Sequence, residues 1–473
     1  MALKALLVIP SHEKVYGMKM APAYPPLGVL YIASVLIGRG VEVGILDADA
    51  DKMSIDDILS EIEHFDPAIV GITATTPTMN EAKGIAEVIK RHRDIPIILG
   101  GIHPTLNPEE CIAWPCFDFV IKGEGETTIG ELADVLKAGT GAFETVKGIY
   151  YKKNGSSHFT GERELIADLD TIPFPARHLL RNISCYKPPD AEKLPVASIM
   201  TTRGCPGRCT YCCTKNIFKD RYRMRGIDNV LEEIELLISR FKVKEIHIAD
   251  DAFNSNKRRT LSLCEAIAKK SYPVNFEFLN GLRADTLDDD MLDAFRSIGV
   301  KNVGFGVESA DRDILKHVKK SIMPEDVERA MRISKKKGFK TWLFFMIGLP
   351  GETEETIKRT IEFAKDVDPD FAKFLIFKPF PGSDIFDEIN GAGLIDDKDY
   401  DHYGVYTPPV HNLPSLSKAD LVSWQKKAFR EFYFRPKKIW DHLIRQRSLA
   451  QLKLSLRGLS FVYFNATKKG GGS

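Results

Sequence analysis

The sequence predicts an α/β protein in which two successive series of strand and helix units are followed by a mostly helical segment. Short apolar runs rich in β-branched residues alternate with helical patterns from the first residues onward. The alternation begins again at about residue 196, after a proline-containing linker. Strands that are apolar on both faces and separated by helices form parallel sheets covered on both sides. We therefore expect one doubly wound sheet followed by a second parallel sheet.

The first series indicates a doubly wound, Rossmann-like domain over residues 1–140. We expect strands at 5–10, 41–47, 68–75, 96–101 and 117–123, with helices at about 27–39, 54–64, 79–92 and 126–137. Ser54 followed by Asp57 is a helix-start signal. Ligands of such sheets bind beyond the carboxyl ends of the strands. Residues 141–194 are expected to hold a small hairpin with an Asn-Gly turn and a linker.

The second series, over residues 195–395, predicts a partial barrel. Its expected strands are 196–202, 245–251, 275–281, 302–309, 340–348 and 371–380. Six βα units are too few for a closed eightfold barrel, so a partial (βα)6 barrel is expected. Polar and glycine-rich stretches follow the strands, at the end where barrels place their reactive groups. These stretches read "TTRGCPGRC", "DDAF", "GLRAD", "VES" and "IGLPGE".

The composition excludes several classes of protein. The formal net charge is +1, which indicates no polyanionic partner such as nucleic acid. No run of about 18 apolar residues occurs, so neither a spanning helix nor a signal peptide is expected. Four of the eight cysteines are clustered and the others are scattered, which favours a metal or redox site in a reducing cytoplasm over a disulfide framework.

The C-terminal segment, residues 396–469, is expected to open irregularly and to become helical after Ser417. From 426 to 469 it carries twelve Lys or Arg residues against two acidic ones, with aromatic residues interleaved between 424 and 440. One interpretation is a packed helix with solvated lysines. The other is a surface over 424–469 that touches a membrane peripherally and delivers a lipid-like substrate. Residues 470–473 are interpreted as a cloning remnant and excluded.

A cysteine cluster follows the first barrel strand. Cys205, Cys209 and Cys212 have the spacing C-x3-C-x2-C. A structural zinc site would need a fourth Cys or His, and the adjacent Cys213 points away from Cys212 in any regular backbone. Three thiolates that bind a four-iron cluster leave one iron open for a ligand that is not protein. The spacing therefore favours an iron–sulfur cluster.

The stretch "CPGRCTYC" resembles the signature of the radical S-adenosylmethionine (SAM) superfamily. The resemblance implies a 4Fe-4S cluster on Cys205, Cys209 and Cys212, and an electron donor such as flavodoxin or ferredoxin. It assigns no catalytic residue beyond the cluster ligands. Its expected SAM-binding residues are one aromatic and a set of strand-end residues: Tyr211, Asp250, Asp251, Arg283, Glu308, Ser309, Ile347 and Gly348.

The N-terminal domain resembles the cobalamin-binding domain that is fused to some of these enzymes. The matching pieces are 25–36, 71–78, 98–110 and 120–128. The alternative is a Rossmann-like domain with another nucleotide or no ligand, although the usual G-x-G-x-x-G is absent after the first strand. The residues that the resemblance implies for cobalamin are Thr73, Thr75, Thr76, Gly100, Gly101, His103, Gly123 and Glu124.

One departure concerns the lower face of the cobalt. Many cobalamin domains carry D-x-H-x-x-G, whereas the loop 46–54 reads "LDADADKMS" and has no histidine. The resemblance therefore implies base-off cobalamin without a His from this loop. His103 is a candidate neighbour of the corrin, although a single histidine more often serves as a hydrogen-bonding group than as a ligand. A domain that binds no corrin stays open as an alternative.

Together these features predict a cobalamin-dependent radical SAM enzyme of the class B methyltransferase type. The resemblance implies that SAM is cleaved to a 5′-deoxyadenosyl radical and that an unactivated carbon of a small, hydrophobic or lipid-like substrate is methylated. The alternative on the same scaffold is a cyclase, rearrangement or C–C bond-forming enzyme of tetrapyrrole or isoprenoid-lipid type. A non-catalytic cobalamin or metal sensor is the alternative from another class of protein.

Overall fold

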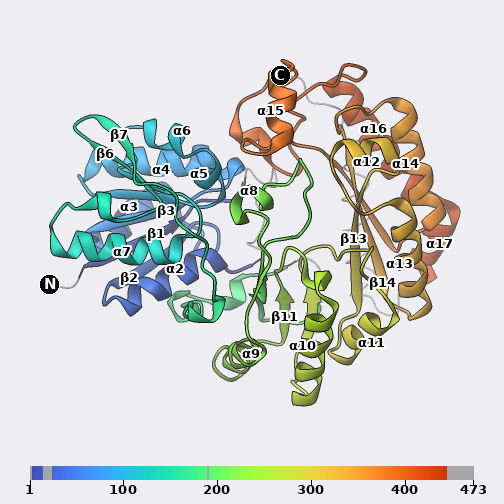
Figure 1. The fold of residues 1–473 in the computed structure, drawn as a ribbon, viewed down its shortest axis with the longest axis horizontal. Coiled ribbons are helices and arrows are strands. Elements are labelled where there is room, and N and C mark those ends of the chain that lie inside the picture. Colours follow the sequence, from blue (N-terminus) through green and yellow to red (C-terminus); the bar gives the residue numbers. More distant parts are fainter. Residues whose placement is uncertain (1–2, 14–23, 189–190, 445–473) are drawn as a thin grey trace.

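The computed structural model describes residues 3–13, 24–188 and 191–444, and it consists of two α/β units placed side by side (Figure 1). The expected cloning remnant and residues 445–469 of the basic segment lie outside the described residues. The N-terminal unit has a seven-stranded sheet with the order β2-β1-β3-β4-β5-β6-β7. Its strands are β1 (Lys4–Ile9), β2 (Glu42–Asp47), β3 (Ile69–Thr73), β4 (Ile97–Gly100), β5 (Phe119–Ile121), β6 (Ile149–Lys153) and β7 (Ser156–Phe159).

Helices cover both faces of the N-terminal sheet, so the predicted doubly wound fold is confirmed. These helices are α2 (Leu27–Gly38), α3 (Ile55–Phe65), α4 (Met79–His92), α5 (Ile102–Leu106), α6 (Pro108–Ala113) and α7 (Gly125–Ala138). Buried residues of α3, α4 and α6 belong to the apolar core on one face, and those of α2 and α7 to the core on the other. Strands β1 to β5 pair in parallel, and the predicted hairpin β6–β7 extends the sheet in antiparallel fashion.

The second unit is an open parallel barrel of six strands. Two ladders, β8-β11-β12 and β13-β14-β15, are joined by a parallel bridge between Leu282 and Phe305. The strands are β8 (Val196–Ile199), β11 (Glu245–Ile248), β12 (Asn275–Phe278), β13 (Asn302–Glu308), β14 (Lys340–Ile347) and β15 (Phe371–Ile376). A short antiparallel pair, β9 (Thr202–Arg203) and β10 (Arg223–Met224), follows β8. The partial barrel predicted from six βα units is therefore present.

The outer face of the barrel is buried under its helices. The helices are α8 (Thr214–Phe218), α9 (Ile227–Phe241), α10 (Lys257–Lys270), α11 (Asp289–Ser297), α12 (Arg312–His317), α13 (Pro324–Lys336), α14 (Glu354–Val367) and α15 (Asp384–Gly391). Alternate strand residues such as Ile246, Phe305 and Leu343 enter one large core with α9, α10, α11, α13 and α14. Buried residues of α12 and α15 form a separate, smaller cluster. Because side chains of a strand alternate between faces, the other half of each strand faces the barrel interior.

The C-terminal helices α16 (Lys418–Tyr433) and α17 (Pro436–Ile444) pack along the barrel (Figure 1). Trp424, Phe429 and Phe432 are buried, and the Tyr433 hydroxyl hydrogen-bonds the backbone of β15 at Ala372. These aromatic side chains therefore form core, as the packed-helix interpretation expected, and do not form an interfacial surface. No helix in the described part of the chain is long and apolar enough to cross a membrane.

Candidate active site

The three clustered cysteines lie on the loop between β9 and α8, at the carboxyl end of β8. Gly204 enters this loop at φ +91°, and a side chain there would collide with the carbonyl of Arg221. A Cβ atom at Gly207 would lie 3.3 Å from the Cys205 sulfur and 4.0 Å from the Cys209 sulfur. The two sulfurs therefore face the same small space, and glycine keeps it open.

Two cations lie close to this space. Burial raises the pKa of the Cys209 thiol, while the Lys320 ammonium acts to lower it. Burial likewise raises the pKa of Cys205, against the lowering effect of the Gly207 amide and the Arg283 charge. Thiolates, which are the metal-binding form of cysteine, are stabilised by such neighbours. Burial raises the pKa of Cys213 to about 12, which keeps that residue a thiol.

The arrangement fits a cluster better than a single ion. Among the described residues no three His, Cys, Asp or Glu side chains converge closely enough to hold one metal ion. A zinc ion needs its ligands at about 2.0–2.3 Å around one point. A four-iron cluster is larger, and each of its thiolates binds a different iron. Two sulfurs beside one glycine, with cations near them, match that larger group.

Several of the expected SAM-binding residues lie together near the cysteines. The Lys320 ammonium is 2.7 Å from the Glu308 carboxylate, and the Tyr211 hydroxyl donates to the same carboxylate at 3.3 Å. Arg283 pairs with Asp285, and its guanidinium also donates to Ser321 at 3.1 Å. This part of the site thus offers buried charges of both signs, which suit the ammonium and carboxylate of an amino acid.

Asp251 also faces the cysteine loop. The residue is exposed, yet partial desolvation by the surrounding loop raises the pKa of its carboxyl, against a hydrogen bond from the Gly204 backbone that lowers it. Its charge in turn acts to raise the pKa of Cys205. The sequence did not indicate Lys320, because it stands in a lysine pair after α12 that is typical of an exposed surface. Its side chain is only 10% exposed in the structure.

Other expected SAM-binding residues are engaged within the protein. Both Asp250 oxygens bind Thr201, through its backbone N–H at 2.6 Å and its hydroxyl at 2.5 Å. The Ser309 hydroxyl accepts from the Asp311 amide at 3.1 Å. Ile347 is buried in the outer core. Asp250 and Ser309 therefore shape the strand ends, and their polar atoms are occupied in this structure.

The expected cobalamin residues meet at the carboxyl edge of the N-terminal sheet. Gly101 adopts φ +111°, and a Cβ there would lie 2.5 Å from the Ala74 carbonyl oxygen. Beside it, a Cβ at Gly100 or at Gly123 would meet no described atom within 4 Å. Thr73 ends β3 at the same edge, and the Thr75 amide and hydroxyl bond Thr78. We call this part of the sheet, at Gly100, Gly101 and Gly123, the glycine edge. Its open backbone fits a large planar ligand.

His103 is fully buried behind this edge. Its Nδ1 atom lies 3.1 Å from the Thr76 hydroxyl, and the ring of Tyr400 packs against it edge-on. Within the described residues its Nε2 atom has no hydrogen-bond partner. Burial lowers the pKa of His103 to about 4, so the imidazole is neutral. The residue is therefore placed as a hydrogen-bonding group beneath the glycine edge.

The loop 46–54 has an imidazole beside it that comes from another strand. His12, just after β1, lies with its Nδ1 atom 3.3 Å from the Asp49 carboxylate, and its backbone N–H donates to that carboxylate at 2.7 Å. The Ser11 hydroxyl donates to Asp49 at 2.7 Å. The sequence interpretation considered the loop alone and missed this histidine, which is brought close only by the pairing of β1 with β2.

Glu124 has a role that the sequence did not indicate. Its carboxylate accepts from Arg203 at 2.8 Å and from both terminal nitrogens of Arg223 at 2.8 and 2.9 Å. Glu126 also pairs with Arg203. All four side chains are at most 10% exposed. Glu124 therefore joins the N-terminal unit to the strand that leads into the cysteine loop, and its oxygens are occupied.

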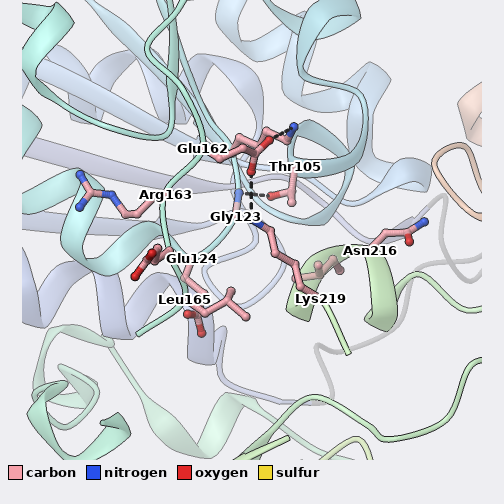
Figure 2. Close-up of a pocket in the computed structure, with 11 residues that line it drawn as sticks. Thr105, Gly123, Glu124, Glu162, Arg163, Leu165, Asn216 and Lys219 are labelled. Atoms are coloured by element: carbon pink, nitrogen blue, oxygen red, sulfur yellow. Dashed lines mark hydrogen bonds and ion pairs between the residues drawn. The ribbon is translucent and has the colours of Figure 1, made fainter. Parts of the chain in front are cut away.

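A shallow pocket opens beside this junction (Figure 2). Gly123 and Thr105 form its N-terminal side, and the Gly123 N–H donates to the Thr105 hydroxyl at 3.2 Å. Asn216 and Lys219 of the α8 region form the other side. The pocket therefore lies between the glycine edge and the segment that follows the cysteines.

Comparisons with known proteins agree with this geometry. The model of the radical SAM superfamily matches residues 199–364, and the model of the B12 binding domain matches residues 13–133. An uncharacterised methyltransferase of Pyrococcus horikoshii is 34% identical over 469 residues, which cover 98% of this chain and 99% of that protein. The chain belongs to the radical SAM superfamily, in the group of enzymes that carry a cobalamin-binding domain.

A second relative and two solved structures extend the likeness. The anaerobic magnesium-protoporphyrin IX monomethyl ester cyclase of Rubrivivax gelatinosus is 28% identical over 437 residues, 91% of this chain and 77% of that protein. The cobalamin-dependent radical enzyme OxsB superposes with a TM-score of 0.77 at 17% identity, over 98% of this chain and 72% of that one. The methyltransferase TsrM of Kitasatospora setae superposes with a TM-score of 0.69 at 21% identity, over 83% of this chain and 75% of that one. These structures share the fold.

Proposed function

We propose that this enzyme methylates an unactivated carbon of a small molecule. One observation carries the proposal: the ion pairs of Glu124 with Arg203 and Arg223 hold the cobalamin-type unit directly against the strand that enters the cysteine loop. Methyl transfer to a carbon radical requires a methyl source and a radical source that face one cavity. When bound, the cluster and cobalamin supply reductive SAM cleavage and methyl transfer.

The chain's own residues would bind and orient SAM. Lys320 and Arg283, the two cations near the sulfurs, suit its carboxylate. Glu308 and Asp251 suit its ammonium group, and Tyr211 would pack beside the cluster. Cys205, Cys209 and Cys212 would hold the cluster. An external one-electron donor such as flavodoxin or ferredoxin would supply the electron.

We further propose that cobalamin binds base-off, with no ligand from the 46–54 loop. The test is the electron paramagnetic resonance spectrum of the cob(II)alamin form. A cobalt with no axial nitrogen gives no nitrogen superhyperfine splitting, and His12→Ala should leave that spectrum unchanged. Nitrogen splitting that persists in His12→Ala would indicate the cofactor's own base on the cobalt and contradict base-off binding, whereas splitting that disappears in that variant would assign the nitrogen ligand to His12.

A second candidate function is cyclisation or rearrangement of a hydrophobic substrate. It is favoured by the relative from Rubrivivax gelatinosus, which is named as a cyclase. The Pyrococcus horikoshii relative is named as a methyltransferase, which favours methyl transfer, and it matches over almost its whole length. A methyltransferase consumes two SAM molecules per product and releases both S-adenosylhomocysteine and 5′-deoxyadenosine, whereas a cyclase of this type releases only 5′-deoxyadenosine.

The experiment that tests the proposal is cofactor analysis with a small-molecule extract as substrate source. The anaerobically reconstituted enzyme should contain corrin and four irons, and reduction with SAM should release 5′-deoxyadenosine together with S-adenosylhomocysteine. Cys209→Ala, which removes one thiolate, should abolish 5′-deoxyadenosine. 5′-Deoxyadenosine without S-adenosylhomocysteine would favour the cyclase, and a Cys209→Ala variant equal to wild type would contradict both functions.

A lipid-like substrate and peripheral membrane contact in a cytoplasmic enzyme are the finer part of the proposal. Phe434, Ile439 and Trp440 support them, because their side chains are 44%, 43% and 64% exposed. Co-sedimentation with anionic liposomes should therefore fall on truncation after Tyr433 or in a Trp440→Ser variant. Equal sedimentation of wild type and variant would contradict membrane contact.

A further inference from the structure

One segment touches both units and the loop after β14. We call residues 399–421 the strap. At its start, Asp399 accepts a hydrogen bond from Asn80 at 2.8 Å, and the Tyr400 hydroxyl donates to Glu110 at 2.7 Å. The Tyr400 ring packs on His103 with 4.6 Å between ring centroids. The strap is thus fixed on the N-terminal unit, close to the glycine edge.

The middle of the strap is held from the barrel. Lys378, just after β15, donates to the carbonyl oxygens of His402 at 2.9 Å and Thr407 at 3.2 Å, and also to that of Pro408. The lysine side chain is buried. A buried ammonium needs such acceptors to offset its lost hydration. The strap backbone therefore runs in a defined path from the N-terminal unit to the barrel.

The end of the strap reaches the peptide that follows β14. His411 is fully buried, and its Nε2 atom lies 2.8 Å from the Gly348 carbonyl oxygen. A carbonyl only accepts, so Nε2 carries the proton and the ring is in the Nε2–H form. The Ser415 hydroxyl donates to the Glu352 carbonyl at 2.7 Å. Two strap side chains therefore bind the backbone of this loop.

The Gly348 peptide is held from both sides. Its N–H donates to the Glu352 carboxylate at 2.6 Å, while its carbonyl accepts from His411. Gly348 adopts φ +102°, and a Cβ there would lie 3.2 Å from Leu421 and 3.4 Å from His411. Glycine supplies this backbone conformation, and the two hydrogen bonds select it. The loop after β14 is consequently pre-organised, and the strap contacts its backbone through His411 and Ser415.

We propose that His411 is a positioning residue for SAM, acting through the Gly348 carbonyl. The inference rests on the proposed function, and it takes Ile347 and Gly348, which the resemblance to radical SAM enzymes assigns to SAM, as the backbone that lies against the adenosyl group. Without the imidazole, the buried carbonyl has no donor and the loop relaxes away from the conformation that fits the adenosyl group. An unsatisfied buried acceptor corresponds to about a tenfold loss in affinity. The His411 end of the strap is then a part of the SAM site.

The test compares three variants of the same strap. His411→Gln places an amide N–H near the position of Nε2, His411→Asn has the same amide but is too short to reach, and His402→Ala changes a second strap histidine. Equilibrium dialysis gives the SAM dissociation constant of cluster-loaded protein. Hydrogen exchange of the 343–354 peptide is followed in cofactor-free protein. Iron content and the unfolding temperature are measured alongside.

The expected dissociation constants for SAM separate the variants. His411→Asn should weaken SAM binding about tenfold and speed exchange in 343–354, whereas His411→Gln and His402→Ala should stay within about threefold of wild type. Iron content should be equal in all of them. Equal SAM affinity in His411→Asn and wild type would overturn the inference while leaving the proposed function intact. A wild-type protein that binds no SAM would overturn both.

Discussion

The buried ion cluster between the two units allows a quantitative test. Arg203 bridges Glu124 and Glu126, and their side chains are 9%, 4% and 9% exposed. The Arg203 guanidinium also lies 5.4 Å from the centre of the Tyr31 ring. Arg203→Met keeps much of the side-chain volume but removes the charge. Glu124 keeps Arg223, whereas Glu126 loses the arginine with which it pairs in the described structure.

Removal of one partner of a buried ion pair costs about 3–5 kcal/mol, because the other charge stays buried and uncompensated. We therefore expect Arg203→Met to lower the free energy of unfolding by that amount in urea denaturation. Arg203→Met combined with Glu126→Leu should recover about half of the loss, since the orphaned charge is gone. The matched control is Lys269→Met, which breaks an exposed pair with Glu265 and should leave the free energy of unfolding close to the wild-type value.

A loss below about 1 kcal/mol in Arg203→Met would refute this reasoning. It would mean that water reaches the junction and screens the charges, so the two units are not tightly docked there. A full loss that Glu126→Leu does not relieve would also contradict it, because the cost would then come from packing. Iron content serves as a second readout, since Arg203 stands two residues before Cys205.

Three further predictions concern the cysteines, the glycine edge and the buried histidine. Cys213→Ala should leave the iron content of reconstituted protein at the wild-type value, whereas Cys209→Ala should lose most of it; equal losses would assign Cys213 to the cluster. Gly101→Ala should destabilise the protein by about 1–3 kcal/mol because of its backbone conformation, whereas Gly100→Ala should leave stability unchanged and weaken corrin uptake. Retained corrin binding in Gly100→Ala would place the corrin elsewhere. The pKa of His103 is lowered to about 4 by burial, so between pH 6.5 and 4 the unfolded chain binds a proton that the folded chain does not. The free energy of unfolding should therefore fall by up to about 3 kcal/mol as the pH falls through this window. His103→Gln should flatten the slope of unfolding free energy against pH. An unchanged slope would contradict a buried, neutral His103.

The strands and the cysteine loop could be predicted because local sequence carries their signals. Two-sided apolar runs separated by helices define parallel strands, and every one of the expected strands overlaps an observed one. The spacing of Cys205, Cys209 and Cys212 is likewise local. The hairpin was expected from its Asn-Gly turn, but its addition to the sheet was not, since that depends on pairing between β5 and β6.

Pairings over long sequence distances explain what could not be predicted. Glu124 stands in a stretch similar to cobalamin domains, but the arginines that occupy its carboxylate come 79 and 99 residues later. His12 and Asp49 are joined only because β1 lies beside β2. Trp424 and Phe432 stand among lysines, a pattern that left a packed helix and a membrane-contacting surface both open. The helix buries both side chains, and Phe432 packs on Phe374 of β15.

The most direct test of cobalamin-dependent radical methylation uses SAM with a deuterated methyl group. Anaerobically reconstituted enzyme, reductant and a small-molecule extract are incubated together, and products are compared by mass spectrometry with those of Cys209→Ala. We expect a product that gains the labelled methyl group, with S-adenosylhomocysteine and 5′-deoxyadenosine in similar amounts, only with the wild-type enzyme. Turnover that yields 5′-deoxyadenosine and a new product without the label would contradict methyl transfer as the function of this chain.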